Sequence, residues 1–234
     1  MLLFSDRDAG ILKRMSTSIL VGDITVPFAE SLEGTLGAKG LQVVPVAGIG
    51  NGTAPASGHS GSPIAWNRPS PLSARTVMTD AFNRSASLDT AVLVFGLASA
   101  GALPGEASDV VSARDPVRLT DEWVRGYLLL VSEIVRCFSL RKKGRIVFVL
   151  SPVPPDACLA LHVAEAAFCR LAEETASRLS IQGNPEIQTL LVRLETAGTP
   201  ADLDWLSSML EQPSFPRPGT RWIKSGSRGL FGKF

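Results

Sequence analysis

The stretch SILVGDITVPFAESLEGTLGAKGLQVVPV, residues 18–46, decides the fold of this chain. It predicts a short apolar strand over Ser18–Val21, a helix over Phe28–Lys39 and a second strand over Leu41–Val46. Gly40 suits the end of the helix because glycine adopts the left-handed conformation that helix termini need. A strand, a helix and a second strand in this order make a β-α-β unit, which indicates a parallel sheet.

The rest of the chain continues this alternation. We expect further strands at 63–67, 88–96, 144–150, 187–194 and 220–224, and helices at 71–85, 120–141, 156–179 and 201–210. The strand at 144–150 is almost wholly apolar, as is typical of a central strand covered on both faces. The order predicts a single-domain α/β fold: a Rossmann-like, doubly wound parallel sheet between two helical layers.

Segments outside the alternation set the domain boundaries. We interpret residues 1–14 as an N-terminal extension and residues 15–234 as the folded domain. Residues 47–63 are almost all Gly, Ala, Ser, Thr and Pro, a composition typical of a flexible loop. Residues 211–234 read as a C-terminal strand and tail.

Composition restricts the kind of protein. Of the 234 residues, 45% are hydrophobic and 19% are charged, which indicates a globular chain. The formal net charge of +1 gives no reason to expect nucleic acid or an anionic membrane as a partner. No apolar run approaches the ~20 residues of a membrane span. Cys137, Cys158 and Cys169 are odd in number and lack zinc spacing, so we interpret them as reduced residues of a cytoplasmic protein.

The order and spacing of these segments resemble the short-chain dehydrogenase/reductase family over nearly the whole length after Ser18. Ile19–Val44 aligns without a gap to the first β-α-β unit of that family, whose glycine-rich turn lets the backbone approach the cofactor pyrophosphate. The glycine positions hold Asp23, Pro27 and Ala29 in this chain. Pro27 removes an N–H donor, and Asp23 places a negative charge where a diphosphate would lie. For Asp23 itself we favour the role of a helix-capping residue.

Other cofactor contacts of the family are also missing. Members often read the ribose with a charged residue after the second strand, but no charged residue occurs between Lys39 and Arg68. The Asn-Asn-Ala-Gly segment after the fourth strand of the family is matched by Phe95-Gly96-Leu97-Ala98, whose apolar groups would fill the cofactor space. The resemblance therefore implies a chain that binds no nicotinamide cofactor.

The catalytic Asn-Ser-Tyr-Lys set of the family is reduced to one member. Gly144–Ser151 resembles the strand that ends in the catalytic serine, although we favour Ser151 as an ordinary strand-end residue. The Tyr and Lys positions hold Leu161 and Glu165, and leucine cannot transfer a proton. Tyr127, the single tyrosine of the chain, lies elsewhere, and no asparagine occurs between 83 and 184.

The sequence contains only weak indications of other catalytic or binding sites. Gly58-His59-Ser60-Gly61 is a near miss of a hydrolase elbow, but it lies in the loop at 47–63. Neither His59 nor His162 has a metal-ligand partner at recognised spacing, so we expect no metal site. We interpret Glu165, Glu173 and Glu174 as a solvated helix face. The C-terminal basic residues read as a solvated tail or as an arm on a neighbouring subunit, with a phosphate or CoA site as the alternative: Arg217, Arg221, Lys224, Arg228 and Lys233.

The resemblance implies a pseudoenzyme subunit without dehydrogenase activity of its own, which pairs with an active short-chain dehydrogenase and stabilises or regulates it. The helices at 120–141 and 156–179 match the four-helix dimer interface of the family, and they would serve equally for self-association. The strand at 220–224 matches its second interface. One alternative is a homo-oligomeric sensor with a small ligand in the old substrate cleft, near Ser151, Leu161 and 152–156. Another is an NAD(P)-dependent oxidoreductase with a rebuilt site.

Overall fold

A computed structural model describes residues 18–49, 62–96, 117, 120–157, 159–181, 186–196, 198–215 and 219–225. Its strands are β1 (Ser18–Gly22), β2 (Gln42–Gly48), β3 (Ile64–Trp66), β4 (Leu88–Phe95), β5 (Gly144–Leu150), β6 (Ile187–Arg193) and β7 (Trp222–Lys224). Its helices are α1 (Pro27–Ala38), α2 (Pro71–Arg84), η2 (Thr120–Arg125), α4 (Gly126–Arg141), α5 (Leu159–Ile181) and α6 (Pro200–Glu211).

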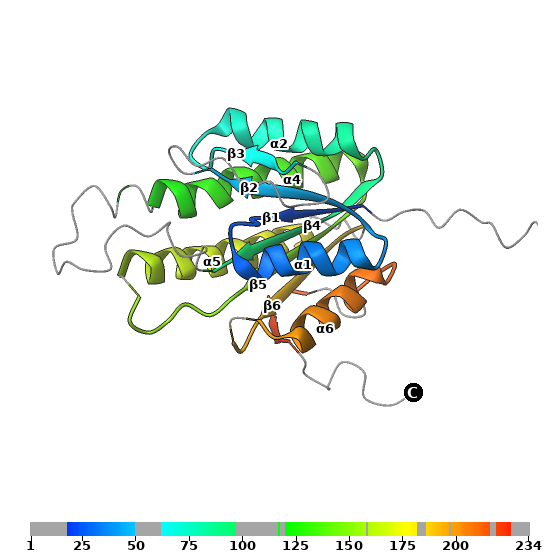
Figure 1. Cartoon of the computed structure of the whole chain (residues 1–234). Coiled ribbons are helices and arrows are strands. Elements are labelled where there is room, and N and C mark those ends of the chain that lie inside the picture. Colours follow the sequence, from blue (N-terminus) through cyan, green and yellow to red (C-terminus); the bar gives the residue numbers. More distant parts are fainter. Residues whose placement is uncertain are drawn as a thin grey trace, which may run out of the picture.

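The strands form one parallel sheet in the order β3-β2-β1-β4-β5-β6-β7. Helices α1 and α6 cover one face of it, while α2, α4 and α5 cover the other (Figure 1). From the central strand β1 the chain continues outward through β2 to β3, and then returns to pair β4 with the other side of β1. The expected single-domain, Rossmann-like α/β fold is therefore confirmed.

This strand order places a topological switch point between the carboxyl ends of β1 and β4. On one side of that point the strand order continues from β1 to β2 and β3, and on the other side from β4 to β5, β6 and β7. The connection after β1 and the connection after β4 therefore leave in opposite directions. In open α/β sheets ligands bind in the crevice at this position. We therefore expect functional residues directly after β1, β2, β3 and β4.

Several element boundaries differ from the expected ones. α5 begins at Leu159 and not at 156, because residues 155–157 form a turn in which the Ala157 N–H donates to the Pro154 carbonyl (3.0 Å). The helix expected at 120–141 begins with the π-helical segment η2 and becomes α-helical only at Gly126. β2 extends to Gly48, the second residue of the expected loop. Residues 1–14, 50–61 and 226–234 lie outside the described part of the chain.

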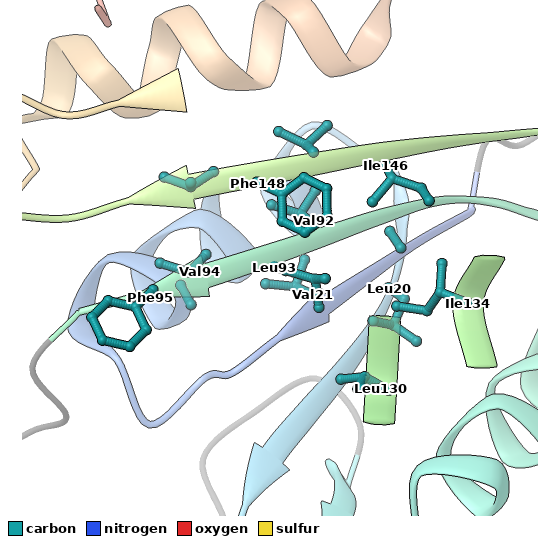
Figure 2. Close-up of a cluster of buried hydrophobic side chains, with 14 of the residues drawn as sticks. Leu20, Val21, Val92, Leu93, Val94, Phe95, Leu130, Ile134, Ile146 and Phe148 are labelled. Carbon is teal, nitrogen blue, oxygen red and sulfur yellow. The ribbon is translucent and has the colours of Figure 1, made fainter. Parts of the chain in front are cut away.

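Buried apolar side chains join the sheet to its helical layers. Figure 2 shows a part of this core, in which side chains of β1, β4 and β5 meet α4: Leu20, Val21, Val92, Leu93, Val94, Phe95, Ile146, Phe148, Leu130 and Ile134. All of these side chains are fully buried. Each contributes about 1.5–3 kcal/mol relative to an exposed position, so the central strands are the most strongly fixed part of the molecule.

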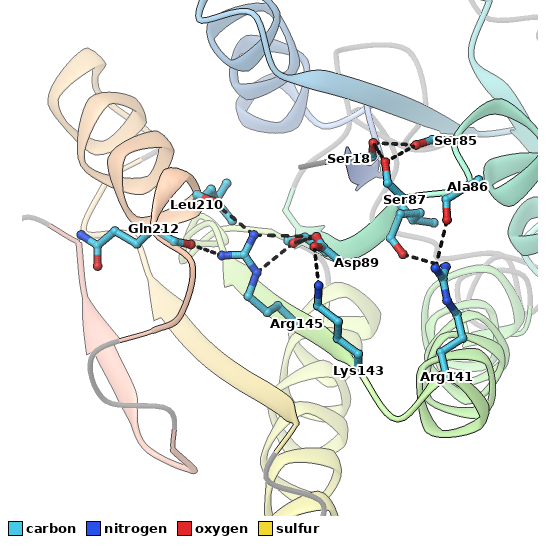
Figure 3. A network of polar contacts seen from close by, with 12 residues as sticks. Ser18, Ser85, Ala86, Ser87, Asp89, Arg141, Lys143, Arg145, Leu210 and Gln212 are labelled. Carbon is cyan, nitrogen blue, oxygen red and sulfur yellow. Dashed lines mark hydrogen bonds and ion pairs between the residues drawn. The ribbon is translucent and has the colours of Figure 1, made fainter. Parts of the chain in front are cut away.

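A polar network ties the amino ends of the strands together (Figure 3). Arg145 at the start of β5 donates from Nε to the Thr90 hydroxyl (3.0 Å) and from its other nitrogens to the carbonyls of Leu210 (3.3 Å) and Gln212. It therefore holds the carboxyl end of α6 against β4 and β5. Because this edge is opposite to the switch point, we assign the network a structural role.

Candidate functional site

Asp23, the residue directly after β1, does not cap a helix. The N-cap residue of α1 is Val26, which makes no side-chain cap bond, and Pro27 takes the first helical position. The capping interpretation is therefore wrong. The Asp23 side chain turns instead toward the ends of β2 and β3, where a buried cation offers a stronger partner than the α1 amides.

The Asp23 carboxylate is fully buried and hydrogen-bonded through both oxygens. Oδ1 accepts from the Gly48 N–H (2.8 Å), the Thr25 N–H (3.2 Å) and the Thr25 hydroxyl (2.9 Å). Oδ2 accepts from Nε (3.0 Å) and Nη2 of Arg68, whose side chain is 5% exposed. A buried ion pair therefore connects the carboxyl ends of β1, β2 and β3.

Aromatic rings and a second carboxylate surround the Arg68 guanidinium. Its Cζ lies 4.7 Å from the ring centroid of Trp123 and 5.6 Å from that of Trp66. A Glu122 carboxylate oxygen lies 3.9 Å from Nη1. Burial alone would lower the pKa of Arg68, but the charge of Asp23, with smaller contributions from Tyr127 and Glu122, raises that pKa above its ordinary value. The guanidinium is thus permanently charged and faces two carboxylates.

Two glycines permit the close packing of this crevice. A Cβ atom on Gly48 would collide with the Arg68 guanidinium, so only glycine fits where β2 meets the ion pair. A Cβ on Gly96 would lie 2.8 Å from the Ser151 Cβ and 3.2 Å from a Val26 methyl. Val26 is itself buried. Side chains of Val26 and Ser151 therefore pack closely around Gly96, the residue after β4.

The other expected cofactor positions also lie in the packed interior. Ala29 is fully buried on α1. Phe95 is fully buried too, stacked on Phe168 at a centroid distance of 5.2 Å and edge-on to Trp123 at 5.5 Å. Leu97 and Ala98 lie outside the described residues.

Ser151, Leu161 and Glu165 do not form a reactive cluster. Ser151 is buried at the end of β5, where its N–H donates to the Phe95 carbonyl (2.8 Å). Leu161 is fully buried in the first turn of α5. The Glu165 carboxylate lies 3.6 Å from His162 Nδ1, one helical turn away and partly exposed. No proton-transferring side chain stands at the position of Leu161.

Tyr127 is buried in the core, where both its hydroxyl and its ring make contacts. Its side chain is fully buried, its hydroxyl donates to the Val94 carbonyl, and its ring lies edge-on to Trp66 and Phe168. Burial, followed by the charge of Asp23, raises the pKa of this phenol well above its ordinary value, although Arg68 opposes the shift. A phenol held neutral in this way does not act as a base near neutral pH.

The glutamates of α5 and the C-terminal Lys224, candidate site residues in the sequence, make structural contacts instead. Glu173 accepts from the Trp222 indole N–H (2.9 Å), and Glu174 pairs with Arg170 (2.5 Å) and Arg178 (3.7 Å) along α5. Lys224 pairs with Glu195 (2.9 Å). Gly58-His59-Ser60-Gly61, Arg217, Arg228 and Lys233 lie outside the described residues, while Arg221 is described and exposed.

Within the described ranges, no group of three or more His, Cys, Asp or Glu side chains is placed to hold a metal ion. No helix in those ranges has the length and apolar character to cross a membrane.

A surface groove of about 680 Å³ runs between η2–α4 and α5. Its apolar lining comes from both sides: Trp123, Val124, Tyr127, Leu128, Val131 and Val135, and Ala167, Phe168, Leu171 and Leu179. Arg136, Arg170, Glu174 and Arg178 stand among its charged residues. The two helices expected to form an interface therefore share an open apolar surface.

Sequence reasoning missed Arg68 as a site residue. It noted Arg68 only as the next charged residue after Lys39, yet this arginine follows one predicted strand as Asp23 follows another. Since the carboxyl ends of parallel strands meet at one edge of a sheet, that placement was the available signal. Thr25, Gly48 and Trp123 carried no comparable signal, because their roles depend on backbone geometry and packing around the pair.

Comparison with known proteins identifies a relative that matches nearly the whole chain. No family model matches the chain. An uncharacterized protein of Treponema pallidum (strain Nichols) is 32% identical over 226 residues, which cover 95% of this chain and 99% of that protein. Identity at this level along the full length of both chains implies common descent and a common fold. The chain therefore belongs to the same family as this treponemal protein.

Proposed function

We propose that this chain is a non-catalytic relative of the short-chain dehydrogenases that assembles with an active member of that family and stabilises or regulates it. The apolar groove between α4 and α5 is the observation that carries the proposal. A continuous apolar surface rimmed by charged residues is typical of a protein–protein contact. The groove lies on the two helices that the resemblance to that family assigns to assembly.

The groove is open enough to receive a partner. Leu128 on its α4 side is 49% exposed. Val163, which lies outside the groove lining and one turn before Ala167 on α5, is 54% exposed. Beneath them, Tyr127 and Phe168 belong to the rigid aromatic core. A preformed apolar floor loses little conformational entropy on association, which favours tight binding.

The chemistry of the crevice supports a role without catalysis. Leu161 offers no proton-transferring group, and Tyr127 is buried with its hydroxyl bonded to the backbone. The Asp23–Arg68 pair and Val26 are buried beside the switch point, where proteins of this fold bind dinucleotides. These residues together argue against dehydrogenase activity of the isolated chain.

The rim of the groove favours a helical partner that carries acidic side chains. Arg170 and Arg178 are 71% and 76% exposed, and they share Glu174, which is only 41% exposed. The outermost charge on the α5 side is therefore positive. Acidic side chains on the partner would add charge complementarity to the apolar contact.

A second copy of this chain is the alternative occupant. Arg170, Glu174 and Arg178 alternate in sign along one face of α5. Antiparallel pairing of two such helices about residue 172 would set Arg170 of each copy against Glu174 of the other. A homo-oligomer with a small ligand in the old substrate cleft receives less support, because Phe95, Ser151 and Leu161 are packed there.

The proposed location is the cytoplasm, where an active dehydrogenase partner would reside. Cys137 and Cys169 are free thiols, half-buried on α4 and α5. Burial is the largest influence on each and raises the pKa of both thiols above the ordinary value, which makes them poorly reactive. Unreactive free thiols fit a reducing compartment.

The test is to tag the chain in its source organism, isolate it gently, and weigh the intact complex by native mass spectrometry. An equimolar partner with an intact Tyr-x-x-x-Lys pair supports the proposal. A complex built from this chain alone supports the alternative. The proposal fails if the purified chain by itself oxidises or reduces a substrate with a nicotinamide cofactor, or if calorimetric titration with that cofactor releases heat.

A further inference from the structure

Five hydrogen-bond donors converge on one small volume at the carboxyl ends of β1, β2 and β3. They are the N–H and hydroxyl of Thr25, the N–H of Gly48, and Nε and Nη2 of Arg68. All five point at the two oxygens of one carboxylate, which belongs to Asp23. Backbone amides joined with a guanidinium in this way are typical of protein sites for carboxylate and phosphate ligands.

We infer that these donors form an anion cradle, and that its resident ligand is the protein's own Asp23 carboxylate. The cradle stands beside the switch point, at the strand ends where proteins of this fold hold external ligands. Asp23 thus acts as an internal substitute for the anionic group of such a ligand.

The cradle is closed to a second anion while Asp23 remains in it. Asp23 is fully buried and Arg68 nearly so, with the Trp123 ring against one side of the guanidinium and Gly48 in direct contact with it. Glu122, 3.9 Å from the same guanidinium, adds another negative charge. An incoming phosphate would meet two carboxylates and no unused donor of the five.

The inference predicts chemical rescue by a small carboxylate. The Asp23 side chain is a methylene and a carboxylate, so Asp23→Gly leaves a space that matches acetate. This variant should lose about 10 °C in the midpoint of thermal unfolding, because it leaves a buried guanidinium without its counter-charge. Saturating acetate should recover most of that loss, whereas butyrate, which is longer, should not.

Two matched variants separate specific rescue from a general effect of salt. Asp23→Asn keeps the volume of the side chain, so its midpoint should fall without responding to acetate. Asp23→Gly combined with Arg68→Met removes the guanidinium of the cradle, so acetate should give no shift beyond that seen with wild type. An equal acetate response in Asp23→Gly and in the double variant would overturn the inference, as would the absence of any response in Asp23→Gly. A response to inorganic phosphate as well as to acetate would show that the cradle also takes tetrahedral anions.

A measurement on the wild-type chain covers the case in which Asp23→Gly cannot be isolated. The Gly48 amide donates to a buried carboxylate, and it should therefore exchange with solvent as slowly as the amides of β1 and β4. Fast exchange at Gly48 would mean that the carboxylate leaves the cradle, which contradicts the inference. None of these results depends on whether the α4–α5 groove carries a partner, so the two proposals can fail separately.

Discussion

Arg68 and Asp23 are forty-five residues apart in sequence, yet the guanidinium of one donates two hydrogen bonds to the carboxylate of the other inside the protein. Breaking a buried pair leaves one charge without compensation, which costs about 3–5 kcal/mol. Arg68→Met keeps much of the side-chain volume and removes the charge. We expect it to lower the free energy of unfolding by about this amount, measured by urea denaturation.

The control for this variant is Arg125→Met, which breaks an exposed pair with Asp121 (3.7 Å). That change should leave the urea midpoint nearly unchanged because water screens the exposed charges. Asp23→Ala combined with Arg68→Met removes both buried charges and should be more stable than Arg68→Met alone. An Arg68→Met variant as stable as wild type would show that the pair contributes nothing to stability.

Gly48→Ala tests whether the Arg68 guanidinium packs directly against Gly48 at the end of β2, and Gly34→Ala is its control. A Cβ at Gly48 would strike Arg68, whereas a Cβ at Gly34, exposed on α1, meets no atom within 4 Å. We expect Gly48→Ala to destabilise the protein by about 1–3 kcal/mol through overpacking. Gly34→Ala should stabilise it by about 0.5–1 kcal/mol, because alanine favours the helix. Thermal unfolding of both variants checks this, and a neutral Gly48→Ala would contradict the close contact.

Tyr127 gives a spectroscopic test, since it is the single tyrosine of the chain. Its folded pKa is raised, so the folded state keeps the phenol proton longer than the unfolded state does. The associated stability is complete below the ordinary tyrosine pKa of about 10 and declines as the pH rises above it. In an alkaline titration, tyrosinate absorbance should appear only together with loss of the folded circular dichroism signal.

The same phenol can be tested by substitution. Tyr127→Phe should cost about 1 kcal/mol because it leaves the buried Val94 carbonyl without its donor. It should also abolish the alkaline absorbance change in every state of the protein. Smooth titration of wild-type Tyr127 near its ordinary pKa, in the folded protein, would exclude the buried phenol.

Arg145 should be irreplaceable by lysine. Its guanidinium spans the Thr90 hydroxyl on one side and the carbonyls of Leu210 and Gln212 on the other, which a single ammonium group cannot do. We expect Arg145→Lys to lower the free energy of unfolding by about 2–4 kcal/mol. Lys143→Met, which removes an exposed neighbour of Asp89 at 3.7 Å, is the control and should have little effect. Equal urea midpoints for the two variants would refute the network's role.

Leu128→Lys tests the groove as an assembly surface. Leu128 is half-exposed in the groove, so the charge should be tolerated by the isolated chain but should disrupt an apolar contact. We expect the complex weighed by native mass spectrometry to dissociate, with the melting temperature of the isolated chain unchanged. Leu140→Lys on the same helix, 73% exposed and outside the groove lining, should leave the complex intact. Survival of the complex in Leu128→Lys would place the contact elsewhere.

Periodicity determined the architecture. The helix-strand alternation from residue 18 onward predicted the parallel sheet and its single-domain fold because apolar spacing is a local property that each segment carries by itself. The positions of β1, β4 and β5 followed for the same reason. Local backbone geometry was not predictable: the helix expected at 120 begins with a π-helical segment, and α5 begins late because a turn precedes it at 155–157.

The sequence by itself also determined that Leu161 and Glu165 cannot supply a tyrosine and a lysine, since residue identity needs no structure. Tertiary structure alone decided the role of Asp23. In sequence it reads as a helix cap, because nearby residues suggest only local partners. Folding brings Arg68 from the end of a different strand and removes water from both side chains. In that buried setting the charge pair is more stable than a helix cap would be. The Asp23 carboxylate therefore binds the donors at the strand ends and closes this site to other anions.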